Sequence, residues 1–409
     1  MDAGHNWAGN IAYAARELHR PTSLEDLRQI VRASRGLRPL GSRHSFSSIA
    51  DTTGDLVDVT ALPAEVDIDE ETATATVAAG VRYGDLAVRL EARGWALKNM
   101  ASLPHITVGG SISTGTHGSG DRNGTLSAAV AAVEFVTADG ELVALARGDE
   151  GFEGAVVSLG ALGVIVRVTL DVVPSYRMRQ DVYGMVSWQS VLERFDEISG
   201  AAYSVSMFTN WTGDDFGDVW MKATGDLPEE LVGVRPFGAA QGLADGPPDN
   251  TTEQGGVEGV WHDRLPHFKM GFTPSNGEEL QSEFLVPRPR ILEALELIRE
   301  LGDDIAPHLL VTELRTMAAD DLWLSGAYET DAVGIHFTWK PHPSEVGALL
   351  HPIEDRLLGL GARPHWGKVS HATDLEALYP RLDDFRALAD RYDPRGKLRN
   401  RYLDERIFS

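Results

Sequence analysis

Apolar residues recur at two different spacings along the first 175 positions of the chain. Helical spacing occurs at 24–33, where Thr22 to Glu25 has the pattern of a capping box, and at 83–93, where Gly94 marks the end. The alternating spacing of strands occurs in seven short stretches: 37–40, 56–59, 66–69, 72–77, 133–137, 142–145 and 165–172. A few helices among many short strands predict an α+β fold rather than regular βαβ alternation.

The pattern changes near Pro174. Beyond it, helices are predicted at 189–198 and 290–301, and strands at 203–208, 309–316 and 333–340. Residues 233–259 are rich in Gly and Pro and have little periodicity, which is typical of a long loop over the surface or mouth of a domain. We therefore expect a first domain over 1–175, a second over 176–370, and a separate C-terminal segment over 371–409.

Composition and charge restrict the possible partners. The 409 residues include 37 Lys and Arg against 61 Asp and Glu, a formal charge of −24, which disfavours nucleic acid and anionic membranes. There is no Cys, and the 13 His residues form no H-E-x-x-H motif, so we expect neither disulfides nor a metal site. The N-terminus has no signal-peptide pattern and no apolar run is long enough to span a membrane, which favours a cytoplasmic protein.

Two glycine-rich stretches are the strongest candidates for a ligand site. Pro39 to Phe46 places small residues around Arg43 and His44, and Val108 to Gly120 has five glycines, five hydroxyls and no carboxylate. Exposed backbone N–H groups in such turns form a nest for a phosphate. No G-x-G-x-x-G is present, which argues against a Rossmann dinucleotide site. Taken alone, the first stretch could also be a glycine-rich turn with a helix-capping His.

Together the two stretches resemble the FAD-binding domain of vanillyl-alcohol-oxidase-type flavoproteins. The resemblance implies a two-subdomain FAD-binding domain, an α+β substrate (cap) domain with an antiparallel sheet, and a tail that returns to the first domain. It also implies that His44 is bonded covalently to FAD. The cofactor residues expected from it are Gly41, Ser42, Arg43, His44, Ser45, Ser102, Gly110, Ser111, Thr114, Thr116, His117, Gly118, Gly163, Val164, Ile165 and His365.

Polar residues on predicted strands indicate a second part of the site. Alternation places Glu313 and Arg315 on one face of the strand at 309–316, and His336 and Thr338 on one face of the next. Lys368 follows in a short turn. Such groups from separate segments are typical of a pocket for a hydrogen-bonding substrate. The alternative for Glu313 and Arg315 is an exposed ion pair on an edge strand, which would contribute little to stability.

These motifs, in order with Met100 to His105, resemble the alditol oxidases, relatives of the aldonolactone oxidases, over nearly the whole chain. The resemblance implies oxidation of the C1 hydroxyl of a polyol such as xylitol or sorbitol, with O2 as acceptor and H2O2 as product. It assigns Ser102, Glu313, Arg315, Thr338 and Lys368 to the polyol. Lys368, His336 and Arg315 are the candidate catalytic residues, and the pattern does not decide which takes the hydroxyl proton.

Three alternatives follow from the same residues. The substrate could be an aldonolactone, bound by the same Glu313, Arg315 and Lys368; the chain could bind flavin without catalysis; and His365 could be a packed side chain beside Trp366. We expect a monomer whose partners are a polyol and O2. The physiological polyol and the acceptor used in vivo are not fixed by the sequence.

Overall fold

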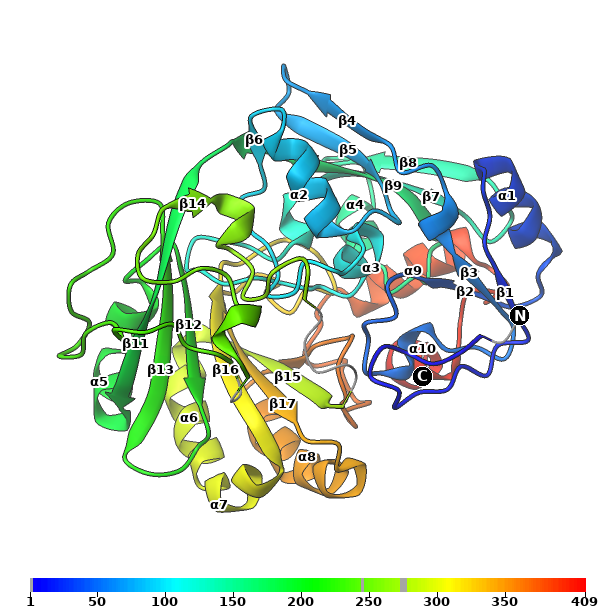
Figure 1. Cartoon of the computed structure of the whole chain (residues 1–409). Coiled ribbons are helices and arrows are strands. Elements are labelled where there is room, and N and C mark those ends of the chain that lie inside the picture. The colour runs from blue at the N-terminus through cyan, green and yellow to red at the C-terminus, as the bar shows by residue number, and fades with distance from the viewer. Residues whose placement is uncertain (1–2, 244–245, 273–277) are drawn as a thin grey trace.

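The computed structural model describes residues 3–243, 246–272 and 278–409. Its main β-sheets form two groups, one in each half of the molecule (Figure 1). The first group holds a small parallel sheet, ordered β1 (Glu17–His19), β3 (Asp55–Asp58), β2 (Leu37–Leu40). Beside it lies an antiparallel five-stranded sheet, in the order β4 (Val66–Asp69), β5 (Thr74–Ala78), β9 (Val164–Asp171), β7 (Val130–Val136), β8 (Leu142–Ala146). The predicted short strands of the first 175 residues therefore form two sheets.

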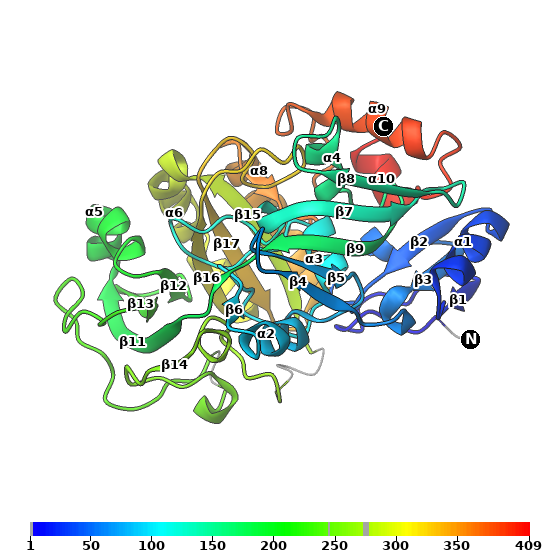
Figure 2. The same cartoon turned by 90° about the horizontal axis from the view of Figure 1, so that it is seen from above.

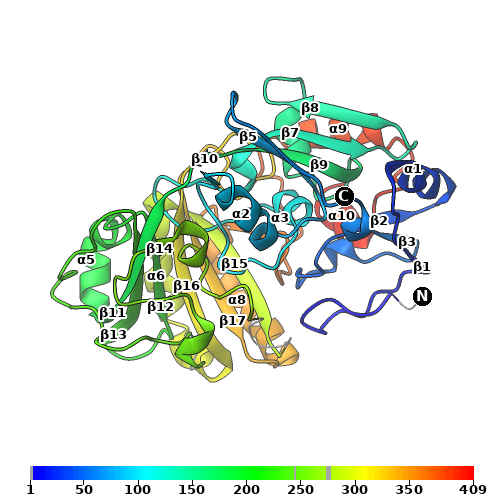
Figure 3. The same ribbon diagram turned by 45° about the horizontal axis from the view of Figure 1, so that its top comes forward.

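Four helices pack in the first half of the chain. They are α1 (Leu24–Ala33), α2 (Tyr83–Glu91), α3 (Val108–Ser113) and α4 (Phe152–Val156). The residues of α1 match the prediction, but its N-cap is Ser23, one residue after the predicted Thr22, and its side chain accepts from the Asp26 N–H. Figure 3 shows α2 and α3 in the middle of the molecule, between the large sheet and the smaller ones.

The expectation of a loop throughout 108–120 is wrong, because its first six residues form α3. Its hydroxyls bond to the helix's own carbonyls: Ser111 Oγ donates to Thr107 O at 2.7 Å, and Ser113 Oγ donates to Gly109 O at 2.7 Å. The serines that suggested anion contacts therefore stabilise local structure, and Val108 and Ile112 are fully buried in the core.

The second half is one antiparallel sheet covered by helices on one face. Its order is β14 (Gly259–Val260), β11 (Arg177–Ser187), β13 (Asp215–Ala223), β12 (Ser204–Thr209), β16 (Leu309–Met317), β17 (Ala332–Trp339), β15 (Leu280–Pro287), β18 (Arg363–Pro364). Helices α5 (Trp188–Ser199), α6 (Ile291–Arg299), α7 (Gly302–Ile305) and α8 (Pro343–Leu358) lie on the outer face (Figure 1). Leu314, Ile335 and Phe337 are fully buried in the core that this face shares with the helices.

The C-terminal segment returns to the first half, where α9 (Leu382–Tyr392) and α10 (Arg401–Arg406) lie behind the smaller sheets (Figure 2). Phe385 and Leu403 are fully buried in the core of that half. Lys397 Nζ donates to the carbonyls of Val31 at 2.9 Å and Ala138 at 2.7 Å, so buried polar contacts also join the tail to it. The described helices include none long and apolar enough to cross a membrane.

Candidate active site

The polar face of the large sheet looks into a cavity of about 450 Å3 between the two halves of the molecule. A smaller cavity of about 90 Å3 shares Gly41, Ser45, Gly110 and Thr114 with it. Most of the sequence-predicted site residues line the larger cavity: Gly41, Ser42, Arg43, His44, Ser45, Ser102, Gly110, Ser111, Thr114, Thr116, His117, Glu313, Arg315, His336, Thr338, His365 and Lys368. The structure thus gathers residues from segments more than 300 positions apart.

The remaining predicted cofactor residues lie elsewhere. Gly163 and Ile165 line only the smaller cavity. Gly118 and Val164 line neither cavity. Val164 is fully buried at the start of β9, and a Cβ atom at Gly118 would lie 2.2 Å from Asn99 Oδ1, so this glycine is needed for packing. The long segment 233–259 reaches the cavity at Leu243 and Gly246, while its residues 244–245 lie outside the described part of the chain.

The loop after β2 brings His44 to the larger cavity. Arg43 has a φ of 62°, a left-handed conformation that turns the chain before His44. The Trp7 ring packs against the imidazole with centroids 4.4 Å apart. Burial, followed by the positive charge of Lys368, lowers the pKa of His44 to about 3. The imidazole is therefore neutral at physiological pH, and no described residue forms a hydrogen bond with it.

The two glycine-rich segments meet closely beside this loop. A Cβ atom at Gly41 would lie 2.5 Å from Thr107 Oγ1 and 3.5 Å from the Gly110 Cα, so only glycine fits there. The buried Thr107 hydroxyl has no hydrogen-bond partner among the described residues. An unpaired buried donor is unfavourable unless a ligand satisfies it, which makes this junction suitable for a polar cofactor group.

Strand register assembles the charged wall of the cavity. Glu313 of β16 lies opposite His336 of β17, which in turn lies opposite Glu283 of β15. Directly opposed residues share a face, so the three side chains form one polar row, and Arg315 follows two residues after Glu313. Because β16 is an interior strand and Glu313 and Arg315 are 8% and 6% exposed, the edge-strand ion pair is wrong for this site.

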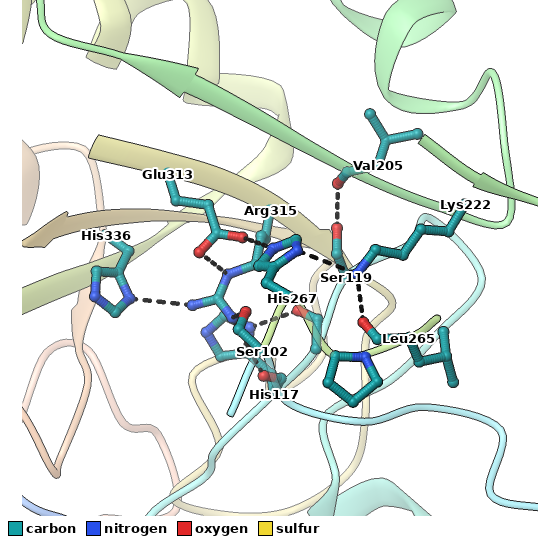
Figure 4. Close-up of polar contacts among 12 residues, drawn as sticks. Ser102, His117, Ser119, Val205, Lys222, Leu265, His267, Glu313, Arg315 and His336 are labelled. Carbon is teal, nitrogen blue, oxygen red and sulfur yellow. Dashed lines mark hydrogen bonds and ion pairs between the residues drawn. The ribbon is translucent and has the colours of Figure 1, made fainter. Parts of the chain in front are cut away.

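Arg315 is the centre of the polar contacts (Figure 4). Its Nη2 lies 3.0 Å from Glu283 Oε1 and 3.1 Å from His336 Nδ1, and its Nε lies 3.5 Å from Glu313 Oε2. Its Nη1 donates to Ser102 Oγ at 3.3 Å. The guanidinium is therefore balanced by two buried carboxylates, and burial of all three is tolerated because they pair with one another.

These contacts shift the ionisation of the groups around them. The positive charge of Arg315 and the hydrogen bond from His267 hold the pKa of Glu313 below its usual range, against the opposing effect of burial. Burial lowers the pKa of His336, and it lowers the pKa of His365 to about 3. Burial also lowers the pKa of Lys368 to about 8. The cavity thus holds fixed charges at Glu313 and Arg315, neutral imidazoles, and a lysine that titrates near neutral pH.

Sequence reasoning missed several residues of this wall. Glu283 pairs with His117, with Nε2 to Oε1 at 2.9 Å, and Gln281 accepts a short hydrogen bond from Lys368. Both lie on β15, where Gln281 and Glu283 alternate with Leu280, Ser282 and Phe284, and this spacing was the signal that could have identified them. His267 and Lys222, which lie beyond Glu313, come from segments with no such pattern.

Elsewhere in the chain, Glu17, His19 and Asp55 place ligand-type atoms within 4.8 Å of one another. Both Asp55 oxygens already accept from Arg16 Nη2 at 2.8 Å, and Ser34 Oγ donates to one of them at 2.7 Å. The Asp55 carboxylate is therefore satisfied by a guanidinium and a hydroxyl, and this group lies outside the cavity lining.

Known proteins resemble the chain in both sequence and fold. An FAD binding domain family matches residues 16–146, and a D-arabinono-1,4-lactone oxidase family matches residues 273–406. The chain is 47% identical to alditol oxidase of Streptomyces sp. strain IKD472 and 30% identical to L-gulono-1,4-lactone dehydrogenase of Mycobacterium tuberculosis. Each alignment covers 97% of this chain and 97% of the relative. Cholesterol oxidase from B. sterolicum has the same fold, with a TM-score of 0.81 at 14% identity over 99% of this chain and 96% of its own.

These matches and the cavity between the two halves define the protein as an FAD-dependent oxidoreductase with the vanillyl-alcohol-oxidase-type fold. The FAD family covers the part of the chain that contains the His44 loop and α3. Within this class, the chain belongs to the alditol oxidase family. The resemblance inferred from the sequence motifs is confirmed.

The residues at the junction fit FAD. Thr107 offers a buried hydroxyl without a partner among the described residues, and Gly41 and Gly110, whose backbones approach closely, line both cavities. The neutral His44 imidazole lines the same cavity and has a free lone pair. His44, Gly41, Gly110 and Thr107 are therefore the residues that would hold the cofactor.

Proposed function

We propose that the protein oxidises the C1 hydroxyl of sugar alcohols such as xylitol and sorbitol to the aldose. When bound, FAD supplies the hydride acceptor at N5 and transfers the electrons to O2, which gives H2O2. The observation that carries the proposal is the cavity wall, on which the acceptor Glu313 lies beside the donor Arg315, with Lys368 lining the same cavity. The 47% identity to an alditol oxidase over nearly the whole chain supports the same substrate class.

A polyol matches this wall because each hydroxyl both donates and accepts. Glu313 has its Oε2 beside Arg315 and its Oε1 beside His267, and each oxygen keeps a lone pair for a substrate hydroxyl. Ser102 and Thr338 add neutral hydroxyls to the cavity lining. Arg315 donates to the C1 oxygen, and Lys368 donates to the same oxygen once its amine has taken up the proton, so both stabilise the negative charge that develops there.

We assign acceptance of that proton to Lys368 in its amine form. Arg315 donates to His336 Nδ1 at 3.1 Å, and a guanidinium has no acceptor, so the neutral His336 ring carries its proton on Nε2 and acts as a donor. Glu283 Oε2 lies farther from the same nitrogen, at 3.3 Å, so Arg315 is the nearer of its two partners. The Lys368 pKa of about 8 places its amine form within reach of physiological pH.

The covalent bond from His44 to FAD is a further part of the proposal. The neutral imidazole supplies the lone pair that a nucleophile needs, and Trp7 holds the ring in place. Acid precipitation of the purified protein should leave yellow flavin in the pellet, whereas His44→Ala should release it or fail to retain FAD. His19→Ala, which changes a histidine outside the cavity, is the control and should behave as the unmodified protein. Complete release of flavin from the unmodified protein would refute the covalent bond.

Oxidation of an aldonolactone is the second candidate. The lactone oxidase family match at 273–406 and the 30% identity to a lactone dehydrogenase favour it. We also propose that the protein is a monomer and that it is cytoplasmic. Gel filtration of the purified protein would test the oligomeric state.

The decisive experiment compares initial rates of O2 consumption with xylitol, sorbitol and L-gulono-1,4-lactone. We expect kcat/KM to be at least ten times higher with a polyol. A preference for the lactone would replace the first function with the second. Glu313→Gln should raise KM for the polyol, since it removes the charge that accepts hydroxyl hydrogen bonds.

A further inference from the structure

A row of buried groups runs from Glu313 through His267, which also lines the cavity, to Lys222, which does not. His267 Nε2 lies 2.7 Å from Glu313 Oε1, and Lys222 Nζ lies 3.1 Å from His267 Nδ1 (Figure 4). Lys222 is 1% exposed and His267 is 3% exposed. Lys222 also donates to the Leu265 carbonyl. The row therefore joins β13, the segment before β15, and the substrate wall on β16.

The contacts fix the tautomer of His267. An ammonium group has three donors and no acceptor, so His267 Nδ1 accepts from Lys222 and the proton of the neutral ring lies on Nε2. That N–H donates to Glu313 Oε1. The ring cannot turn easily, because its edges pack against Phe208 and Trp220 with centroids 5.7 and 5.3 Å away. Glu313 is thus held by His267 on one oxygen and by Arg315 near the other.

Packing alone does not account for a lysine at position 222. A methionine would fill a similar volume without desolvating an ammonium group, and buried ion pairs are seldom more stabilising than apolar replacements. Lys222 is close to a histidine and, through it, to a carboxylate of the substrate wall, but it does not line the cavity. Lys222 therefore acts on the site through His267, which its Nζ contacts.

We propose that Lys222 and His267 are positioning residues that keep the Glu313 carboxylate charged and in one orientation toward the hydroxyl groups of the substrate. The inference rests on the proposed function, in which Glu313 binds the polyol. It adds two residues that neither the glycine-rich segments nor the polar strand faces indicated. In their absence Glu313 would keep its place on β16 but lose the hydrogen bond that sets the direction of its lone pairs.

The test measures binding of xylitol to the dithionite-reduced holoenzyme by calorimetry, because the reduced protein binds the polyol without turnover. A hydrogen bond to a charged group is worth roughly a tenfold to hundredfold change in affinity, so Lys222→Met and His267→Leu should raise Kd by about tenfold or more. His267→Gln keeps an N–H donor at the position of Nε2 and should restore most of the affinity. In turnover, KM should rise more than kcat falls.

Lys397→Met is the matched control. Lys397 is also a buried lysine, but its ammonium donates to the backbone carbonyls of Val31 and Ala138, in the other half of the molecule. Its loss can lower stability, and it should leave Kd for xylitol unchanged. Unchanged Kd in both Lys222→Met and His267→Leu, with normal binding by the unmodified protein, would refute the inference.

A second readout does not depend on the substrate. Ring nitrogen chemical shifts of His267 in the unmodified holoenzyme, assigned by their loss in His267→Gln, should show a protonated Nε2 and an unprotonated Nδ1. The opposite tautomer would overturn the arrangement. If the unmodified protein neither binds nor oxidises a polyol, the proposed function fails and the substrate part of the inference fails with it, while the tautomer still tests the geometry of the row.

Discussion

Replacement of Arg315 by Met would test whether the charges of the cavity wall depend on one another. Arg315 Nη2 lies 3.0 Å from Glu283 Oε1, and Arg315 Nε lies 3.5 Å from Glu313 Oε2. Both carboxylates are buried, with Glu283 2% exposed. Methionine fills most of the arginine stem but leaves these two carboxylates without their shared cation. The substitution therefore removes a charge and few packing contacts.

Removing one partner of a buried ion pair lowers the free energy of unfolding by about 3–5 kcal/mol. Unfolding entropy of about 2 cal/mol/K per residue gives, for 409 residues, a decrease in melting temperature of roughly 3–6 °C. The same substitution removes a donor to the C1 oxygen, which typically reduces kcat by about 10²–10³-fold. The protein should therefore fold, bind FAD and lose most of its turnover.

The pH dependence of the stability loss separates this explanation from simple loss of packing. Arg315 holds the pKa of Glu313 and Glu283 low, so both pKa values should rise in Arg315→Met. As pH falls, the folded variant takes up protons that the unmodified folded protein does not, and the difference in melting temperature between the two should shrink from pH 8 to pH 5. Differential scanning calorimetry at several pH values measures it.

Arg38→Met is the control for this experiment. Arg38 is 2% exposed and donates only to backbone carbonyls, including Ile49 O at 2.7 Å and Leu398 O at 2.8 Å. Carbonyls do not titrate, and Asp393 acts on the charge of Arg38 without forming an ion pair with it, so the stability loss should decrease less toward low pH than that of Arg315→Met. A decrease in the melting temperature of Arg315→Met that is below about 1 °C, or that is equal at pH 8 and pH 5, would refute the reasoning.

Three further predictions concern the cofactor, the proton acceptor and the buried imidazoles. Gly41→Val should abolish FAD retention, because its Cβ would lie 2.5 Å from Thr107 Oγ1. Gly225→Val is the control and should retain the flavin absorbance, because no atom lies within 4 Å of its Cβ. Equal FAD retention by the two variants would contradict the prediction. Lys368→Met should lower kcat by about 10²–10⁴-fold with FAD retained. In the unmodified protein kcat should increase with pH up to about 8, because the Lys368 amine is the proton acceptor. A pH-independent kcat in the unmodified protein would exclude Lys368 as the proton acceptor. In the folded protein His267 and His365 have pKa values of about 4 and 3, below the usual 6.5 of the unfolded chain. As pH decreases below about 6.5 the unfolded state therefore binds protons first, and the melting temperature should fall. A melting temperature that stays constant or rises would contradict this prediction.

Local patterns predicted much of the fold. The strand at Leu37–Leu40 and the helix at Leu24–Ala33 have the predicted bounds, because each has one clear periodicity and a recognisable terminus. The helix at Val108–Ser113 was missed because Gly, Ser and Thr are poor helix formers. It forms because its hydroxyls bond to the preceding turn, a local effect, and because Val108 and Ile112 are buried in the core, a tertiary effect.

Local patterns also predicted only part of the cavity wall. Alternation correctly placed Glu313 with Arg315 on one face of a strand, and His336 with Thr338 on one face of another. Pairing of β15 with β17 brings Glu283 beside them, and that register is not encoded locally. Lys222 and His267 are 45 positions apart and both distant from Glu313, so only the folded chain reveals their contact.

Anaerobic addition of xylitol to the purified yellow protein, followed by its flavin absorption spectrum, tests the central claim most directly. We predict complete bleaching of the flavin band by a slight excess of xylitol, and its recovery with formation of H2O2 when air is admitted. A flavin spectrum that xylitol and sorbitol leave unchanged would contradict the assignment of Glu313, Arg315 and Lys368 to a polyol.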